Sequence, residues 1–334
     1  PHYQVWMPSK QSMVVADESQ LIPLDLAQNL DKEPDRLLYL ASVTKLAQML
    51  EQASRGEELL SPIQSNLVPL PHQIAALRKV LSTPVTRFLL ADEVGLGKTI
   101  EAGMVMKELK LRGVAKRILV VVPKGLATQW DAEMRHHFNE QFQIVNGEDI
   151  SSLDRLFASD GGAWKVFDQV LVSLDSIKPM VRRRGWSKER IEEYNRTRLG
   201  NLLKATWDLI IIDEAHRIGG STEQVARYKL GKALAEVAPH ILLLSATPHQ
   251  GKSDAFFRLL NILDAHAFPE PNAVTKERVQ QYLVRTEKRN ALNDKGLPLF
   301  QPRTTRLHPV SWGVEYDRHR ELYEAVSSYV RFGY

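Results

Sequence analysis

The sequence predicts an α/β fold, built on a mainly parallel sheet flanked by helices, with a small accessory segment before it. Short runs of apolar residues recur between residues 88 and 244, and stretches with helical periodicity separate them. The runs are apolar throughout, which is typical of strands buried on both faces, and alternation with helices favours parallel pairing. The expected strands are Phe88–Leu90, Ile118–Val122, Val170–Leu174, Leu209–Ile212 and Ile241–Leu244.

The composition sets broad limits. A chain of 334 residues with 43% hydrophobic residues has room for about two domains and a large core. The absence of cysteine excludes disulfides, thiolate metal sites and a cysteine nucleophile, and fits a reducing cytoplasm. No apolar run approaches the ~18 residues of a membrane span, and no signal-peptide pattern opens the sequence, so we expect a soluble cytoplasmic protein without a membrane partner. The net charge of +4 is compatible with a polyanionic partner.

Residues 1–65 form the expected accessory segment. Short extended pieces over Gln4–Met7 and Met13–Ala16 are broken by prolines, and the apolar spacing over Asp35–Gln52 predicts a helix. Three prolines between residues 61 and 71 indicate a linker. We therefore place a domain boundary near residue 65.

Residues 66–270 carry the strand pattern, and residues 271–334 are expected to be a helical and extended linker. Phe256–Leu263 has the spacing of an amphipathic helix. Thr275–Asn293 is expected to form another, followed by an extended stretch over residues 297–302 and a helix over Tyr316–Val330.

A glycine-rich loop follows the first expected strand. Residues 91–99 read ADEVGLGKT, which departs from the strict phosphate-loop pattern only at Asp92. Its glycines let backbone amides turn toward phosphate oxygens, and the helix expected over Lys98–Arg112, ended by Gly113, would point its N-terminus at them. Lys98 would reach the β- and γ-phosphates and Thr99 would ligate magnesium. The alternative is a tight turn without a ligand. The candidate nucleotide-binding residues are Asp92, Glu93, Val94, Gly95, Leu96, Gly97, Lys98 and Thr99.

A pair of acids closes the fourth expected strand, in the sequence LIIIDEAH. Because neighbouring residues leaving a strand point in different directions, Asp213 is assigned to magnesium and Glu214 to polarising the attacking water. The alternative is two solvated carboxylates at a strand end, which the phosphate loop upstream disfavours. His216 is assigned to coupling this site to the next motif, with a bond to a neighbouring loop as the alternative.

Basic residues gather between Lys178 and Arg198, where eight cations face three acids. One interpretation is a solvated, charged insertion. The other is an arm that contacts nucleic-acid phosphates, with Trp186 either stacking on a base or anchoring the segment.

From residue 70 to 303 the motifs occur in the order of a known family. The chain resembles superfamily-two helicases and, among them, Swi/Snf-type double-stranded-DNA translocases, most closely the bacterial RapA-like branch and the helicase-like proteins of phage-defence systems such as DISARM. The motifs that carry the resemblance are LPHQIAAL, LLADEVGLGKTIEAG, VVPKGLATQW, LVSLDSI, DEAH, LLLSATP, HQGKSDAFFRLLNIL, YLVRTEKRN and LPLFQPRTT.

The resemblance implies a RecA-like P-loop lobe that binds ATP and Mg²⁺, and that contacts the backbone of DNA, in most cases duplex DNA. It places Gln73 where the family reads adenine, and Ser245 and Thr247, with His216, where hydrolysis is linked to movement. The nucleic-acid contacts implied by position are Pro123, Lys124, Gln129, Trp130, Ser173 and Gln250.

The family also has a second RecA-like lobe that supplies arginine fingers, and no part of this sequence resembles it. An arginine finger contributes about 10³- to 10⁵-fold in related phosphoryl-transfer enzymes. We therefore expect poor ATP turnover by this chain alone, and we expect a fragment of a larger motor rather than a natural single-lobe protein. Its partners would be the second lobe and subunits of a bacterial defence or transcription complex near the nucleoid.

Three other functions stay open. The lobe could belong to a helicase that unwinds RNA or DNA, which stimulation by the corresponding nucleic acid would reveal. It could be a non-hydrolysing ATP-binding scaffold, in which Glu214→Gln would change nothing. The parent could also be a restriction-type motor, although no nuclease carboxylate cluster is evident in this sequence.

Overall fold

The computed structural model describes residues 2–7, 12–17, 40–45, 59–147, 162–180, 182–219, 225–247, 253–301, 305–306 and 317–332. In the accessory segment, β1 (His2–Met7) pairs antiparallel with β2 (Ser12–Asp17), so both expected extended pieces are strands. Residues 40–45 are helical, and the rest of the helix expected over Asp35–Gln52 lies outside the described residues.

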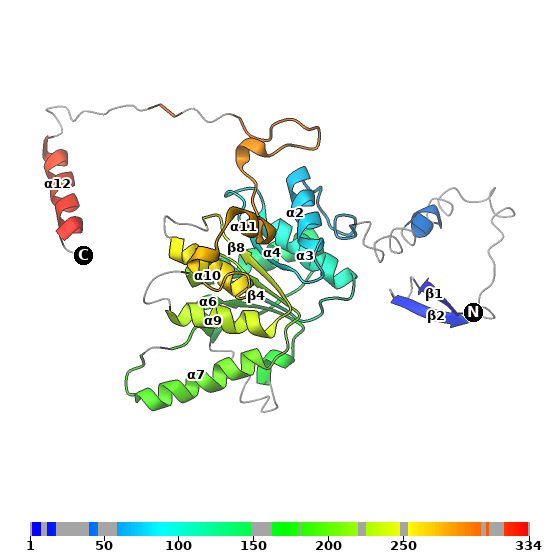
Figure 1. Ribbon diagram of the computed structural model, residues 1–334, viewed down its shortest axis with the longest axis horizontal. Helices are drawn as coiled ribbons and strands as arrows, with labels where there is room; N and C mark the ends of the chain where they lie inside the picture. The colour runs from blue at the N-terminus through cyan, green and yellow to red at the C-terminus, as the bar shows by residue number, and fades with distance from the viewer. Residues whose placement is uncertain are drawn as a thin grey trace.

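The main body of the protein is an α/β sandwich around one parallel sheet, as the sequence predicts (Figure 1). Seven strands occur in the order β5-β6-β4-β7-β8-β3-β9 among the described residues, and every neighbouring pair is parallel. Their bounds are β3 Arg87–Leu90, β4 Ile118–Val122, β5 Gln143–Val145, β6 Gln169–Ser173, β7 Leu209–Ile212, β8 His240–Leu244 and β9 Leu283–Val284.

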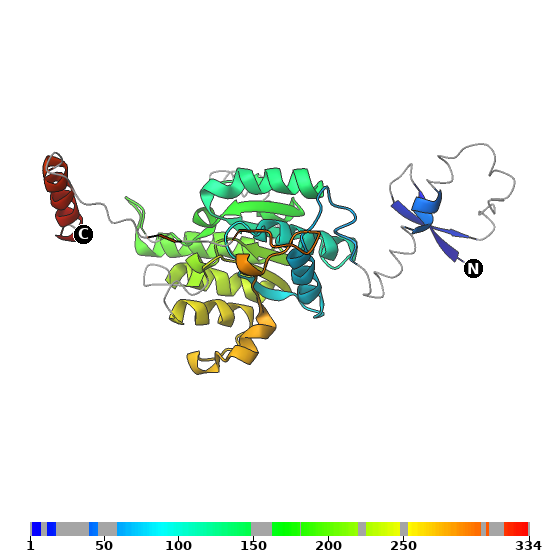
Figure 2. The same ribbon diagram turned by 90° about the horizontal axis from the view of Figure 1, so that it is seen from above.

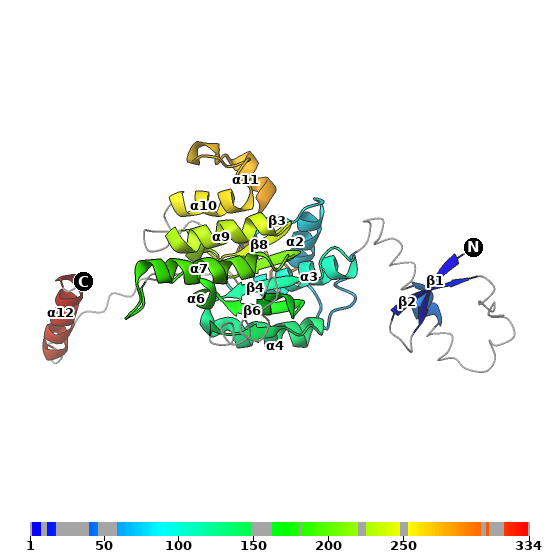
Figure 3. The ribbon, with the colours of Figure 1, turned by 90° about the horizontal axis from the view of Figure 1, so that it is seen from below.

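Helices cover both faces of the sheet (Figures 2 and 3). One face packs against α2 (Pro71–Leu81), α3 (Lys98–Leu111) and α4 (Ala127–Phe138). The other packs against α7 (Lys188–Leu203), α9 (Val225–Val237), α10 (Ser253–Leu263) and α11 (Lys276–Tyr282). The remaining helices are α6 Leu174–Ile177, α8 His216–Gly219, α12 Asp317–Phe332, and the 3-10 turns η2 Lys124–Leu126, η3 Gly162–Lys165, η5 Pro271–Ala273 and η6 Lys288–Asn290.

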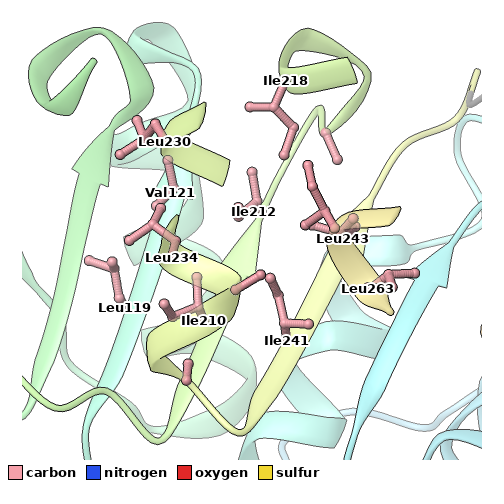
Figure 4. Packing of buried hydrophobic residues seen from close by; sticks show 14 of the residues in the cluster. Leu119, Val121, Ile210, Ile212, Ile218, Leu230, Leu234, Ile241, Leu243 and Leu263 are labelled. Carbon is pink, nitrogen blue, oxygen red and sulfur yellow. The ribbon is translucent and has the colours of Figure 1, made fainter. Parts of the chain in front are cut away.

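The strands are mostly apolar because each supplies residues to both cores. Alternate side chains of a strand point to opposite faces, so Ile210 and Ile212 enter the core under α9 and α10, whereas Leu209 and Ile211 enter the core under α3 and α4. Figure 4 shows the first core, where Leu234 of α9 lies against strand residues of β4 and β7. All four residues of β7 are buried, as expected for a central strand of a covered sheet.

A close contact between α3 and α4 depends on Gly103. A Cβ at this position would lie 2.2 Å from the ring of Phe138, so only glycine allows this contact between the helices. The C-terminus of α3 is also as expected, since Gly113 has a φ of 70° and its backbone amide donates to Lys110.

The expectations for the C-terminal part need correction. The helix expected over Thr275–Asn293 is wrong beyond Tyr282, because Leu283 and Val284 pair with Leu89 and Leu90 as the edge strand β9. In the stretch expected to be extended, residues 297–301 belong to no named strand, and Pro298 forms an isolated antiparallel bridge with Leu292. The helix expected over Tyr316–Val330 is present as α12.

Packing against the lobe begins before the boundary expected near residue 65. The backbone amides of Leu60 and Ser61 both donate to the carboxylate of Glu108 on α3, at 2.9 and 2.6 Å. Among the described helices, none has both the length and the apolar character that a membrane crossing requires.

Candidate functional site

The predicted chemistry gathers at the carboxyl ends of three adjacent strands. The glycine loop follows β3, the acid pair follows β7, and Ser245 follows β8, which lies between them. Backbone hydrogen bonds continue across this edge, from Ser245 N to Leu90 O at 3.0 Å and from Ala215 N to Leu244 O at 2.8 Å. Ligands of open α/β sheets bind at this edge.

The glycine loop has the backbone geometry of an anion cradle. Gly95 and Gly97 have φ angles of 87° and 89°, in the left-handed region that favours glycine. Gly97 is the N-cap of α3 and has no side chain to cap it, so the first amides of a 14-residue helix face the loop. A Cβ on Gly97 would lie 2.6 Å from the side-chain amide nitrogen of Gln73, so a larger residue here would displace that side chain from its bond to Leu96.

Lys98 lies at the base of the loop and is half-buried. Its amino group donates to the carbonyl oxygen of Asp92 at 2.8 Å, while Val94 at the tip of the loop is 68% exposed. A lysine amine held beside amides at a helix N-terminus fits the phosphate groups of a nucleotide.

The two acids at the start of the loop do not face its interior. Asp92 is fully buried and accepts a hydrogen bond from the amide of Thr286 at 2.6 Å, and Glu93 accepts one from the amide of Lys288. These bonds attach the loop to the segment after β9. A Cβ on Gly95 would lie 3.9 Å from the amine of Lys288, a cation that the sequence did not single out.

Gln73 lies beneath the loop, and both polar atoms of its side-chain amide form hydrogen bonds. Its oxygen accepts from the amide of Leu70 at 2.9 Å and its nitrogen donates to the carbonyl of Leu96 at 3.1 Å. The side chain is 6% exposed, so it supports the loop and the start of α2. Reading of adenine by Gln73 stays a prediction.

A buried polar cluster of His72, Asp92 and Glu101 also lies under the loop. Ligand atoms of these three residues lie within 4.8 Å of one another, and within the described residues both oxygens of Glu101 and one of Asp92 have no hydrogen-bond partner. Burial, and then the neighbouring Asp92, raise the pKa of Glu101 to about 10, so its carboxyl is neutral at pH 7. The set could hold a metal ion only if Glu101 gave up this proton. Neither His72 nor Glu101 has a sequence signal apart from proximity to the loop.

The acid pair is held in a defined geometry. Asp213 accepts from the indole nitrogen of Trp130 at 2.8 Å through one oxygen and from the amide of Glu214 at 2.7 Å through the other. Glu214 has a φ of 48°, which is strained for a residue with a side chain and is typical of functional sites. A half-buried carboxylate oriented in this way fits a magnesium ligand.

His216 lies between the acid pair and the end of β8. Its Nδ1 is 3.0 Å from a carboxylate oxygen of Glu214 and 3.3 Å from the hydroxyl of Ser245. His216 therefore contacts both the acid pair and the next motif, and its role in coupling them stays a prediction. Thr247 is exposed.

The residues expected to contact nucleic acid divide into two groups. Lys124 and Gln129 are exposed, although Gln129 donates to Glu133. Pro123 is buried, and Gln250 lies outside the described residues.

Two of those expectations need correction. Trp130 is 2% exposed and its indole N–H is bonded to Asp213, so its side chain supports the acid and is not available to nucleic acid. Ser173 is 7% exposed and its hydroxyl caps α6 by accepting from the amide of Ser176 at 3.1 Å, so it positions the chain after β6. The sequence cannot distinguish these roles, because a motif position does not show whether a side chain points to solvent or to the protein interior.

Comparison with known proteins gives one family. Residues 7–297 match the model of the SNF2-related domain. The RNA polymerase-associated protein RapA of Vibrio cholerae is 36% identical over 255 residues, which is 76% of this chain and 24% of that protein. RapA of Pseudomonas aeruginosa is 37% identical over 229 residues, 68% of this chain and 22% of that protein. The chain thus spans about a quarter of the length of these relatives.

Solved structures share the fold. The SWI2/SNF2 ATPase core of Sulfolobus solfataricus in complex with dsDNA has a TM-score of 0.53 and 19% identity, covering 72% of this chain and 48% of that one. A second structure, of the Sulfolobus solfataricus SWI2/SNF2 ATPase core domain, has a TM-score of 0.51 and 19% identity. It covers 69% of this chain and 46% of that one. At this identity the likeness concerns the fold alone.

Proposed function

The chain belongs to the SNF2-related domain family, and we propose that it is the ATP-binding lobe of a duplex-DNA translocase. One observation carries the proposal. A glycine cradle at a helix N-terminus, an oriented carboxylate and a histidine bridge lie at the carboxyl ends of the adjacent strands β3, β7 and β8. A static binding module has no need of an acid pair linked to the next motif.

The residues at this edge fit ATP and magnesium. The amides after Gly95 and Gly97 and the amine of Lys98 would hold the phosphates, and Thr99 and Asp213 would hold the metal. Magnesium, when bound, neutralises charge on the phosphate oxygens. Glu214 would orient the attacking water, since its carboxylate is adjacent to Asp213 and is held by His216.

Support for duplex DNA comes from the fold and the exposed residues near the site. The similar Sulfolobus core is described in complex with dsDNA. In this chain Lys124 is exposed in η2, directly after β4, where it could meet a phosphate without reading a base. Contacts of this kind depend on salt and depend little on sequence.

A second lobe and a transcription complex are the proposed partners. The relatives that bear the name RNA polymerase-associated protein are about four times as long as the matched region, which leaves room for further domains in such proteins. An arginine finger from a second lobe would complete the site, and we propose that turnover by this chain alone is slow for that reason.

The test combines nucleotide binding with ATP hydrolysis. Binding of a fluorescent ATP analogue should be lost in Lys98→Ala and kept in Glu214→Gln. Hydrolysis should be abolished in both variants, with Lys295→Gln, at an exposed lysine that has no proposed role in the site, as the control.

Hydrolysis is then measured with duplex DNA, single-stranded DNA and RNA, with and without a separately supplied second lobe from a homologue. Preferential stimulation by duplex DNA supports the translocase. Preferential stimulation by RNA or by single strands would support an unwinding helicase. ATP binding with no hydrolysis under any condition, and no effect of Glu214→Gln, would support a scaffold.

A further inference from the structure

A run of exposed basic residues lies in the basic arm, which we define as residues 182–198. Six of its cations are exposed, and they comprise Arg182, Arg183, Arg184, Lys188, Arg190 and Arg196. In the part of the chain that the structure describes, none of these six forms an ion pair. The neighbouring pairs are made instead by Lys178 and Arg227, both with Asp175.

The acids of the arm do not neutralise its arginines. Glu189 lies in the first turn of α7, where hydrogen bonds to its own backbone amide and to Ser187 lower its pKa. A carboxylate at this position is favoured by the helix N-terminus. Glu192 and Glu193 are exposed and lie outside ion-pairing distance of the described cations.

The arm also holds two arginines over one aromatic ring. The amide of Trp186 donates to the carbonyl of Arg183 at 3.2 Å, closing a turn in which Gly185 has a φ of 78°. This turn places the guanidinium of Arg183 4.3 Å from the centre of the Trp186 ring. The guanidinium of Arg190, in the first turn of α7, lies 4.5 Å from the centre of the same ring. Stacking of a guanidinium on an aromatic face leaves its N–H edge available for a phosphate.

The arm is attached firmly to the lobe. Asn195 of α7 both donates to and accepts from the backbone of Met180 at 2.8 Å, and Ile191 is buried against the body. The ring of Trp186 packs edge-on against Tyr194 at 5.4 Å. Side chains held in this way lose little conformational entropy when they bind.

The position of the arm connects it to the edge where nucleic acid is expected. The chain leaves β6 at Ser173, forms α6, and enters the arm within a few residues. Figure 1 shows α7 along the outer side of the lobe, beyond α6 and α9. Arg183 lies in the turn before α7 and Arg190 lies in the first turn of α7, so both belong to the segment that follows the carboxyl end of β6.

We propose that the basic arm is a second contact to the backbone of duplex DNA, in which Arg183 and Arg190, ordered by Trp186, each bind a phosphate. The proposal rests on the proposed function for its choice of duplex DNA over other polyanions. The contact is to phosphates, so it adds affinity and carries no base specificity.

The test is the salt dependence of duplex-DNA binding by the whole chain, measured by fluorescence anisotropy without nucleotide. The arm variant is Arg183→Gln with Arg190→Gln. The control is Lys276→Gln with Lys295→Gln, which removes the same charge from exposed sites outside the arm. Each lost phosphate contact lowers the slope of log K against log salt by about 0.9, so the arm variant should lose about 1.8. The control slope should stay at the wild-type value.

A third variant separates ordered arginines from charge alone. Trp186→Leu keeps every charge, and we expect it to weaken binding while the salt slope stays near that of the wild type. An arm variant that binds like the control would overturn the proposal and leave the proposed function intact. Wild-type chain that binds no duplex DNA at low salt would overturn both, and preferential binding of RNA or single strands would overturn the duplex assignment.

Discussion

The indole of Trp130 should determine how well the site holds magnesium. Trp130→Phe keeps an aromatic ring in a buried position. It removes the N–H that donates to Asp213 at 2.8 Å and part of the indole ring. A hydrogen bond to a charged group contributes about 1.5–3 kcal/mol. Loss of a partner that orients a metal ligand typically costs about 10- to 100-fold in metal affinity. We expect a rise of that size in the magnesium concentration that gives half-maximal binding of a fluorescent ATP analogue.

Trp164→Phe is the matched control. Trp164 is equally buried, at 1% exposed, and within the described residues its indole nitrogen has no hydrogen-bond partner. Both variants lose packing, so both should lower the thermal midpoint. Only Trp130→Phe should change the magnesium requirement, and nucleotide binding without magnesium should be the same in both. Equal magnesium requirements in the two variants would refute the assignment of Trp130 as a residue that positions Asp213.

Other perturbations test the packing and the buried charges. Gly103→Ala should destabilise the fold by about 1–3 kcal/mol, because the new Cβ would contact the ring of Phe138. Gly200→Ala in α7, where a Cβ has open space, should stabilise the fold by about 0.5–1 kcal/mol. Equal urea midpoints of the two variants would contradict this. Burial lowers the pKa of His240, so the unfolded chain binds a proton that the folded chain does not, and stability falls as pH drops below about 6.5. His240→Asn keeps an acceptor for the backbone amide that His240 binds, so its urea midpoint should vary less between pH 7 and 5.5 than that of the wild type. The raised pKa of Glu101 means that the folded chain holds a proton the unfolded chain has released, so stability falls as pH rises from 7 to 9. Glu101→Gln should remove that part of the decline in the thermal midpoint, and an unchanged decline would show an ionised Glu101.

Much of the site could be predicted because its chemistry is contiguous in sequence. The glycine loop, Lys98 and the pair Asp213 and Glu214 each follow a strand directly, and parallel strands bring their carboxyl ends to one edge. Continuous apolar runs identified the five longest strands of the sheet, which are β3, β4, β6, β7 and β8. The edge strand β9 was not predicted, because two residues have no periodicity and their pairing with β3 is a tertiary event.

Roles that depend on where a side chain points could not be predicted in this way. Trp130 and Ser173 occupy motif positions expected to contact nucleic acid, yet one is bonded to Asp213 and the other caps α6. The protonated Glu101 follows from its burial beside Asp92, which no local pattern indicates. The stacking of Arg183 and Arg190 on Trp186 likewise needs the turn at Gly185.

The sequence by itself determined the parallel α/β sheet, the glycine loop and the acid pair, because strands, helices and the turns between them follow from local residue patterns. Only the tertiary structure decided which polar side chains are buried and what each one bonds to. Hydrogen-bond partners such as Trp130 and Asp213 are 83 positions apart in the chain, and their meeting depends on the packing of α4 against the sheet.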